Sequence, residues 1–308
     1  MKEERKPVFA DWLVLITLMF VWGSSFILIK RGLEVFDNLQ VGALRVSISF
    51  LALLPFALRR ISRVNLKNIH LFIFAGVTGN ALPAFLFATA QMKLDSFMAG
   101  ILNSLTPLFT LLLGVWLFGR KTHFLNVIGV ILGFAGAAGL LYAAGGGDLR
   151  LNLVPSLLVV LATICYATNM NFVKNYLTGY DPVTIAAIAF VFIGIPSVIY
   201  VGFYTDFWSR LHNVDGAWAS LGYIALLSVF GTALAVISYF WLIKRTSALF
   251  ASSVTYLMPI VSILWGIFDG EPFLIVFMFW ITFILGGVYL ANKPPEKLKR
   301  AIKKLLRM

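Results

Sequence analysis

The sequence predicts an all-α membrane protein with ten transmembrane helices in two inverted five-helix repeats and both termini in the cytoplasm. Two observations support this prediction. Of the 308 residues, 60% are hydrophobic and 12% are charged, and the mean hydropathy of +0.91 is too high for a water-soluble domain. The chain also resembles itself after a shift of about 144 to 152 residues, which is typical of membrane proteins built from two related bundles.

Ten stretches are long and apolar enough to cross a bilayer, which requires about 20 mainly apolar residues. They are expected at residues 12–30, 39–58, 70–90, 96–117, 124–143, 152–172, 183–203, 217–241, 249–268 and 272–291. The first five make up the first repeat, residues 1–146, and the other five make up the second, residues 147–292. The connections between them are short and leave no room for a sizeable soluble domain.

Matching positions define the repeat. Lys30 is followed seven residues later by Asp37, as Lys174 is by Asp181. The other matches are Trp22-Gly23-Ser24-Ser25 with Tyr166-Ala167-Thr168-Asn169, Gly79-Asn80 with Gly231-Thr232, Phe87 with Tyr239, Pro107 with Pro259, and Gly136 with Gly287. Because each repeat holds an odd number of spans, the second repeat begins on the opposite side of the membrane. The repeats are therefore expected to be inverted, with Lys30 and Lys174 facing opposite compartments.

The basic residues indicate which side is cytoplasmic. Most of them fall at the termini and in the loops that end on one side of the membrane, whereas the other side has only Lys30, Arg31, Lys93, Arg150 and Arg210. The positive-inside rule then places both termini in the cytoplasm. The net charge of +12 is explained by topology, and no nucleic-acid partner is expected. The basic amphipathic tail at 293–308 is expected to lie on the anionic inner leaflet of the lipid bilayer.

Three prolines predict kinks at matching depth in three spans. Proline lacks an N–H, so the carbonyl four residues earlier loses its helix partner, and such a group must be satisfied by protein, water or a bound molecule. The kink residues are Pro83, Pro107 and Pro259, and the polar side chains beside them are Asn80, Asn103 and Thr255. This pattern predicts a central polar cavity between the repeats. The alternative is that a neighbouring side chain satisfies each freed carbonyl.

Aromatic and hydrogen-bonding residues complete the predicted substrate-binding site. Trp22 and Ser25 are three residues apart and share a helix face, as do Tyr166 and Asn169 in the other repeat. An aromatic ring and a polar group from each half are suited to hold a small amphipathic molecule. Further candidates are Phe85, Tyr239 and Tyr256. Taken singly, each of these aromatic residues is also compatible with ordinary packing.

Arg45 is the one ionisable residue well inside a predicted span. A charge at this depth is costly and marks a functional hypothesis for which a partner must be named. One hypothesis is that Arg45 receives a substrate carboxylate. The alternative is a structural bond to helix-end carbonyls or to an outer carboxylate such as Glu34 or Glu271.

Several chemistries are excluded by what the spans lack. The sequence places no Asp or Glu in the middle of a span, which argues against direct proton antiport through a membrane carboxylate. His70, His123 and His212 fall at span ends or in loops, so neither a metal cluster nor a nucleophile–histidine pair is expected inside the bilayer. No enzyme activity and no cofactor are therefore predicted.

Glycines in the fifth and tenth spans predict close helix contact. They are Gly129, Gly133 and Gly136 in the fifth span and Gly286 and Gly287 in the tenth. Small residues at this spacing let helix backbones approach each other in a membrane. Whether the contact is made within one chain or between two chains is left open by the sequence.

The residues above resemble the EamA-type branch of the drug/metabolite transporter superfamily. The resemblance covers residues 10–292 and is carried by Trp22-Gly23-Ser24-Ser25-Phe26 with Lys30, by Leu44-Arg45, Thr106-Pro107, Met258-Pro259 and Gly270-Glu271-Pro272, and by the glycine-rich fifth and tenth spans. It implies a ten-helix fold of two inverted repeats. One departure is Gly119-Arg120-Lys121, where related proteins often carry an acidic residue after the fourth span.

The resemblance and the predicted lining together imply a secondary transporter in the inner (cytoplasmic) membrane. The expected partner is a small-molecule substrate, in the first place an exported amino acid, that binds in a central cavity and crosses by alternating access. Two alternatives remain open. One is a carrier of nucleotide sugars or other metabolites, and the other is a lipid scramblase or channel.

Overall fold

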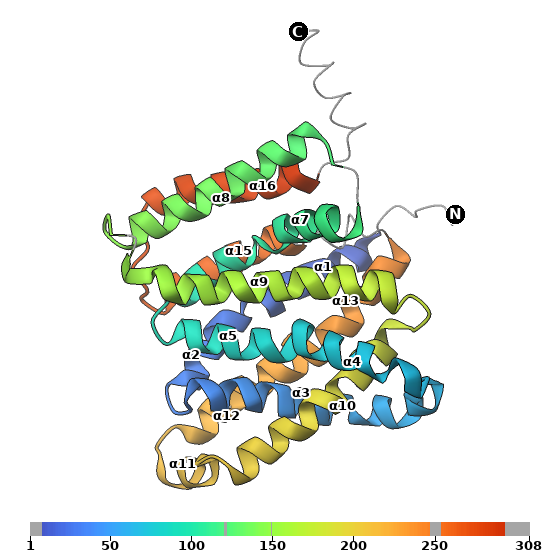
Figure 1. Ribbon diagram of the computed structural model, residues 1–308. Helices are drawn as coiled ribbons and strands as arrows, with labels where there is room; N and C mark the ends of the chain where they lie inside the picture. The colour runs from blue at the N-terminus through green and yellow to red at the C-terminus, as the bar shows by residue number, and fades with distance from the viewer. Residues whose placement is uncertain (1–7, 120–121, 149, 247–253, 293–308) are drawn as a thin grey trace.

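The computed structural model describes residues 8–119, 122–148, 150–246 and 254–292, and the predicted tail at 293–308 lies outside them. Within the described residues every regular element is a helix (Figure 1). In the first half these are α1 (Phe9–Gly23), α2 (Ser25–Leu33), α3 (Asn38–Arg60), α4 (Ile69–Gly76), α5 (Leu82–Gln91), α6 (Ser96–Asn103), α7 (Thr106–Phe118) and α8 (Phe124–Ala144). In the second half they are α9 (Arg150–Tyr176), α10 (Pro182–Phe203), α11 (Phe207–Asn213), α12 (Ala217–Ser228), α13 (Ala235–Arg245), α15 (Val254–Phe268) and α16 (Val276–Asn292).

The described part of the chain contains eight helical segments that are long and apolar enough to cross a membrane. Two shorter apolar helices, Leu257–Phe268 and Val276–Ala291, occupy the last two predicted positions. The all-helical membrane fold predicted from composition is confirmed. Large apolar side chains, among them Trp116 and Phe203, are exposed on the outside of the bundle, as expected where lipid replaces water as the solvent.

One span begins later than predicted. Helix α16 starts at Val276, whereas the apolar run of the sequence predicts a start at 272. Glu271 precedes a proline, and the residue before proline is disfavoured in the helical region. Its carboxylate is also bonded to the first residues of α6, so the chain from 271 to 275 connects α15 to α16 without forming a helix.

Repeat-equivalent helices pack against each other in antiparallel pairs. Helices α3 and α10, the second span of each half, lie along each other. Arg60 pairs with Asp181 at one end, and Gln40 donates to Asp206, just beyond the C-terminal end of α10, at the other. The residue numbers of the two helices run in opposite directions along the contact. Lys30 and Lys174, which lie close to the first turns of these helices in the sequence, are therefore at opposite ends of the bundle.

Helices α8 and α16, the fifth and last spans, form the second such pair and lie side by side at one edge of the bundle (Figure 1). Gly129 approaches Ala291, and Gly139 approaches Trp280, so this pair is antiparallel as well. The predicted close contact of the glycine-rich helices is thus made within one chain. Two equivalent helices that pack antiparallel have the relation that an in-plane two-fold axis requires.

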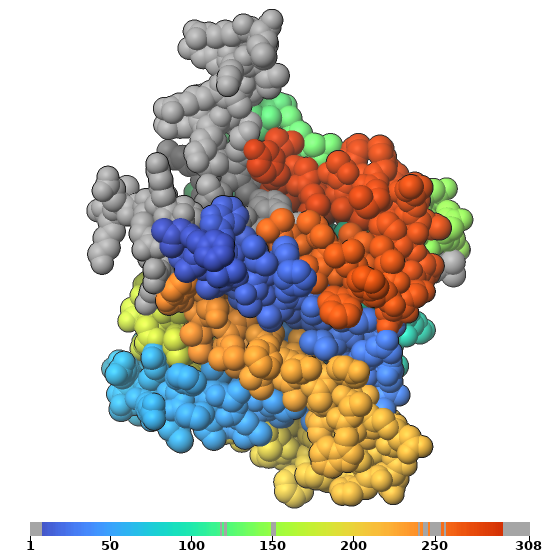
Figure 2. Space-filling view, turned by 180° about the vertical axis from the view of Figure 1, so that it is seen from behind, coloured from blue at the N-terminus to red at the C-terminus, as the bar shows by residue number. Residues whose placement is uncertain are grey.

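The remaining contacts are exchanged between the halves. Helix α1 packs against α13 and α15 of the second half, and α9 packs against α5 and α7 of the first half. Figure 2 shows part of this exchange at the surface, where the blue segment of α1 lies against orange and red segments from the second half. The first span of each half therefore lies among helices of the other half, and the space between the halves is bounded by both.

Two spans contain a π-helical segment at equivalent positions. These segments are η3 (Val77–Ala81), between α4 and α5, and η4 (Val229–Leu234), between α12 and α13. Proline is not the common cause, because Pro83 follows η3 directly, whereas neither η4 nor the following helix α13 contains a proline. The wider turn places Gly79 and Gly231 at the cavity between the halves. π-Helical turns of this kind are frequent at functional sites.

The predicted kinks at the other prolines differ from each other. The fourth span is broken between α6 and α7, and Pro107 sits in the first turn of α7. The carbonyl of Asn103 accepts a hydrogen bond from Thr106 Oγ1 at 2.8 Å, so a neighbouring side chain does satisfy it. Helix α15 continues through Pro259. The count of ten membrane spans and the side of the termini stay predictions.

Asp181 gives a pH-dependent contribution to stability. Its carboxylate caps α10 by accepting from the Val183 and Thr184 N–H groups, both at 3.2 Å, and it pairs with Arg60. Partial desolvation opposes ionisation, but the Thr184 and Arg60 bonds outweigh it and lower the pKa of Asp181. Because its pKa is lowered in the folded state, the ionised carboxylate stabilises the fold at pH values above the ordinary pKa of Asp. This stabilisation is lost as the pH falls through the folded-state pKa.

We therefore expect Asp181→Ala to cost about 1 kcal/mol at neutral pH, the usual cost of losing a helix cap. The difference in melting temperature between the wild type and the variant should shrink as the pH is lowered from about 6 towards about 3, below the ordinary Asp value. The control is Asp215→Ala, at an exposed carboxylate. A difference for Asp181→Ala that stays constant over this pH range would contradict the assignment.

Candidate functional site

A cavity of about 290 Å³ lies between the two halves. It is lined from the first half by α1, α2, α3, α4, η3, α5, α6 and α7, and from the second half by α9, α10, η4, α13 and α15. Nine of the residues proposed from the sequence line it: Trp22, Ser25, Arg45, Asn80, Asn103, Tyr166, Asn169, Tyr239 and Thr255. They come from both halves, because the exchanged packing brings the first span of each half to the centre.

Two aromatic pairs line the cavity in equivalent positions. The rings of Trp22 and Tyr239 are 5.2 Å apart between centroids, and those of Phe87 and Tyr166 are 6.1 Å apart. Trp22 corresponds to Tyr166 in the repeat, and Phe87 corresponds to Tyr239. Each pair therefore joins the first span of one half to the third span of the other. Such rings suit an apolar or aromatic substituent.

The π-helical segments hold polar groups at the cavity wall. Trp22 Nε1 donates to the Gly231 carbonyl of η4 at 2.9 Å, which orients the indole. In the other half, the amide of Asn169 lies so close to Gly79 of η3 that a Cβ there would be 2.2 Å from Asn169 Nδ2. Gly79 is required because a side chain would displace a residue of the cavity wall.

Two oxygen atoms at the cavity lack a hydrogen-bond partner among the described residues. They are Oδ1 of Asn169 and Oγ1 of Thr232, both fully buried as atoms, and Thr232 as a whole is 5% exposed. A buried polar atom without a partner is costly, about 1 to 3 kcal/mol. Both oxygens can accept a hydrogen bond, but neither atom is open to the cavity, so its side chain has to turn before a bound molecule reaches it.

Arg45 lines the cavity from α3, between buried neighbours on both sides in the sequence. It makes no hydrogen bond or ion pair with any residue that the structure describes. The structural partners considered from the sequence are engaged elsewhere, since Glu34 pairs with Arg31 and Glu271 with Lys30. Arg45 thus brings a positive charge without a partner among the described residues to the same cavity wall as Asn169 and Thr232.

Two of the proposed site residues are not found at the cavity wall. The Phe85 ring packs instead against Gly42 of α3, where a Cβ would lie 2.5 Å from it, and Phe87 lines the cavity in its place. Helical geometry explains the difference, because residues two apart point in different directions. The side chain of Tyr256 lies outside the described part of the structure.

Sequence reasoning also missed lining residues for which a signal existed. Phe87 and Thr232 line the cavity, and both appear in the repeat as partners of Tyr239 and Asn80. If the repeat-equivalent position of every candidate had also been taken as a candidate, Phe87 and Thr232 would have been found. Phe26 lies at a centroid distance of 5.6 Å from Phe87. The repeat gives no signal for it, because in the sequence Phe26 is one of many apolar residues of the first span.

The fold and this cavity define a multi-pass membrane protein with a cavity of small-molecule size between two related halves. The chain belongs to the EamA-like transporter family, whose model matches residues 10–142 and again residues 154–293. The resemblance noted in the sequence is therefore confirmed, and the protein is a transporter of this family. The predicted multi-pass membrane protein is confirmed by this match and by the apolar helices of the described residues.

Individual relatives are similar along most of their length. An uncharacterized transporter of Archaeoglobus fulgidus is 23% identical over 91% of this chain and 97% of the relative. The uncharacterized inner membrane transporter YedA of Escherichia coli is 27% identical over 91% and 92%. A probable terminal-alkyne amino-acid exporter of Streptantibioticus cattleyicolor is 24% identical over 82% and 83%.

A solved structure titled "Crystal structure of protein" has the same fold. It superposes with a TM-score of 0.61 at 18% sequence identity, over 92% of this chain and 96% of that one. This likeness concerns the fold alone. The relatives above carry transporter or exporter names.

Proposed function

We propose that this protein exports small zwitterionic metabolites, in the first place amino acids with an apolar or aromatic side chain, by alternating access around the central cavity. The observation that carries the proposal is the unpaired Arg45 at the cavity wall. A substrate carboxylate supplies the counter-charge that the described residues do not, and a guanidinium binds a carboxylate with two parallel hydrogen bonds.

The other cavity groups support the remaining parts of such a substrate. Asn169 and Thr232 line the cavity, and a rotation of either side chain would bring an acceptor oxygen to a substrate ammonium group. The two aromatic pairs suit an apolar side chain. The name of the Streptantibioticus relative, a probable terminal-alkyne amino-acid exporter, also supports an amino-acid substrate and the outward direction.

The size and charge of the cavity argue against the alternative substrates. Its volume of about 290 Å³ is at the lower end of small-molecule sites, roughly 300 to 1,000 Å³, which is small for a nucleotide sugar. One arginine is also little charge for a diphosphate. A lipid scramblase would use a groove that faces the bilayer, whereas this cavity is bounded by helices of both halves.

The antiparallel packing of equivalent helices supports the inverted, ten-span arrangement as part of this proposal. In that arrangement Lys30 faces the outside and Lys174 the cytoplasm. Without a carboxylate in mid-span, transport follows the gradient of the substrate or exchanges one substrate for another.

A counterflow experiment in liposomes tests the substrate class. Vesicles containing purified protein are loaded with an unlabelled compound, and uptake of labelled leucine or phenylalanine is followed. We expect counterflow with the zwitterionic amino acids, and a strong reduction for the matching amine without its carboxyl group. Equal counterflow with the amine and the amino acid would contradict a carboxylate site at Arg45, and no exchange of any amino acid would refute the proposed substrate class.

A further inference from the structure

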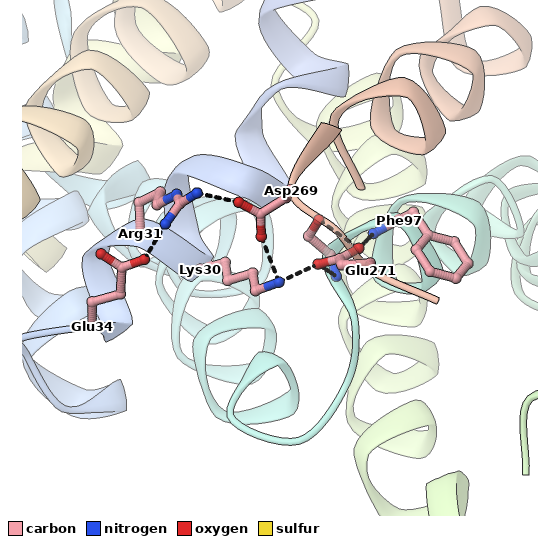
Figure 3. Close-up of polar contacts among 7 residues, drawn as sticks. Lys30, Arg31, Glu34, Phe97, Asp269 and Glu271 are labelled. Carbon is pink, nitrogen blue, oxygen red and sulfur yellow. Dashed lines mark hydrogen bonds and ion pairs between the residues drawn. The ribbon is translucent and has the colours of Figure 1, made fainter. Parts of the chain in front are cut away.

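Ion pairs join the two halves at one end of the bundle (Figure 3). Lys30 Nζ, on α2, is 2.6 Å from Asp269 Oδ2 and 2.7 Å from Glu271 Oε1. The neighbouring Arg31 pairs with Asp269 and with Glu34. We refer to these five residues as the Lys30 cluster. Because Asp269 and Glu271 follow α15, the cluster connects the first span of one half to the ninth span in the other.

The acidic side of the Lys30 cluster is buried. The side chains of Asp269 and Glu271 are 7% and 2% exposed. Glu271 also accepts from the backbone N–H groups of Ser96 and Phe97, at 2.9 and 3.1 Å, and so caps the N-terminus of α6. Buried charges are tolerated when they are paired, and removing one partner is strongly destabilising. Separating α2 from these carboxylates is therefore costly.

Lys30 also balances a third carboxylate. Burial and the nearby charge of Glu271 raise the pKa of Asp95, and Lys30 lowers it. Asp95 precedes α6 directly. The charge of Lys30 thus acts on Asp95 as well as on its two ion-pair partners, Asp269 and Glu271.

A packed layer lies between the Lys30 cluster and the cavity. Gly100 of α6 has no side chain, and a Cβ there would lie 2.3 Å from Ser262 Oγ and 3.1 Å from the Phe26 ring. Phe26, Phe97 and Ser262 are all buried. Phe26 is itself part of the cavity wall, so this layer closes the cavity towards the Lys30 cluster.

The cavity extends towards the opposite end of the bundle. There its wall includes Val173 near the end of α9, and Pro182 and Ile185 in the first turn of α10. All three are only partly buried, and the adjacent Asp181 side chain is 37% exposed. This is the end at which Lys174 lies.

The Lys174 end has no equivalent of the Lys30 cluster among the described residues. Lys174 matches Lys30, but the positions that match Asp269 and Glu271 are Leu117 and Gly119. Lys174 is exposed and makes no ion pair with any described residue. The same end does have the Arg60–Asp181 pair. That pair joins α3 and α10, which already pack together along their length, and it does not cross the cavity.

We infer that the Lys30 cluster is the gate at one end of the transport path, and that the two gates are chemically unlike although the repeats match. The structure is the conformation open towards Lys174. Exposing the cavity on the Lys30 side requires breaking the Lys30 contacts with Asp269 and Glu271, so weakening them shifts the conformational equilibrium towards the state open at that side. The inference rests on the proposed alternating-access transport but not on the identity of the substrate.

Cysteine accessibility tests the gate. Cys165→Ser removes the single native cysteine, and Ser25→Cys then places a reporter thiol at the cavity wall. A membrane-impermeant methanethiosulfonate reagent is applied to right-side-out and to everted vesicles. We expect the parent protein to react faster from the Lys174 side. Asp269→Asn and Lys30→Gln should each raise the rate from the Lys30 side about tenfold, as a shift of about 1.4 kcal/mol does.

Arg60→Gln is the matched control, because it breaks an ion pair between the halves at the other end and should leave the Lys30-side rate unchanged. Asp269→Asn leaves the bonds of Glu271 to the N-terminus of α6 in place. This variant therefore tests the gate even if Lys30→Gln fails to fold. An unchanged Lys30-side rate in Asp269→Asn, or an equal increase in Arg60→Gln, overturns the gate. If the rates respond as expected but no amino acid is exchanged in liposomes, the gate stands and the proposed substrate class fails.

Discussion

Replacing Arg45 with Gln is expected to lower the transport efficiency for amino acids about 100-fold, which corresponds to about 2.7 kcal/mol of lost interaction. Arg45 is the cavity charge without a partner among the described residues. Truncating one partner of a buried, hydrogen-bonded charge pair typically costs about 2 to 5 kcal/mol of binding free energy. Glutamine keeps part of the length and the polarity of arginine but neither the charge nor the planar pair of donors.

The loss should depend on the substrate. Counterflow of compounds without a carboxyl group should change little in Arg45→Gln, and Arg45→Lys should restore only part of the rate because an ammonium group does not bind a carboxylate through two parallel bonds. The measurement is initial-rate counterflow over a range of substrate concentrations. Arg59→Gln, at an exposed arginine near the end of the same helix, is the control.

Two results would contradict this role of Arg45. One is a similar loss for amino acids and for the amines derived from them, which would indicate a structural role. The other is an Arg45→Gln protein that transports normally, which would leave Arg45 outside the binding site. Thermal melting of the purified variant separates a structural loss from a lost contact with substrate.

A methyl group at Gly287 is expected to destabilise the fold by about 3 kcal/mol, the upper part of the usual range for overpacking. A Cβ there would lie 2.4 Å from the Gly133 nitrogen and 2.5 Å from the Gly129 oxygen. Both are backbone atoms, which cannot turn away as a flexible side chain can. Gly287→Ala must therefore push α16 from α8.

The adjacent Gly286 provides a sharp control. A Cβ at Gly286 meets no atom within 4 Å, so Gly286→Ala should melt close to the wild type. The measurement is thermal unfolding of both variants in the same detergent, followed by tryptophan fluorescence. Since neither α8 nor α16 lines the cavity, the Gly287→Ala protein that does fold should keep the substrate affinity of the wild type. Equal melting temperatures for the two variants would contradict the backbone contact.

The sequence by itself determined the kind of protein and most of its helices. Apolar runs of helix length indicate membrane spans, because backbone N–H and C=O groups in the bilayer must be hydrogen-bonded within the protein and a helix pairs them within one segment. The matched positions of the two halves, such as Trp22 with Tyr166, also pointed to residues that do line the cavity. These signals are local or periodic, so they can be read without knowing which helices touch.

Only the tertiary structure decided how these helices exchange partners and what each charge contacts. Lys30 meets Asp269 and Glu271, more than two hundred residues away, and this leaves Arg45 without the partner that the sequence allowed for it. The π-helical turns, and the choice of Phe87 over Phe85 at the cavity wall, were likewise not readable from the sequence. Both features depend on how far the helix turns about its own axis at that point. Such a turn changes which side chains face the cavity but leaves the hydrophobicity of the span unchanged.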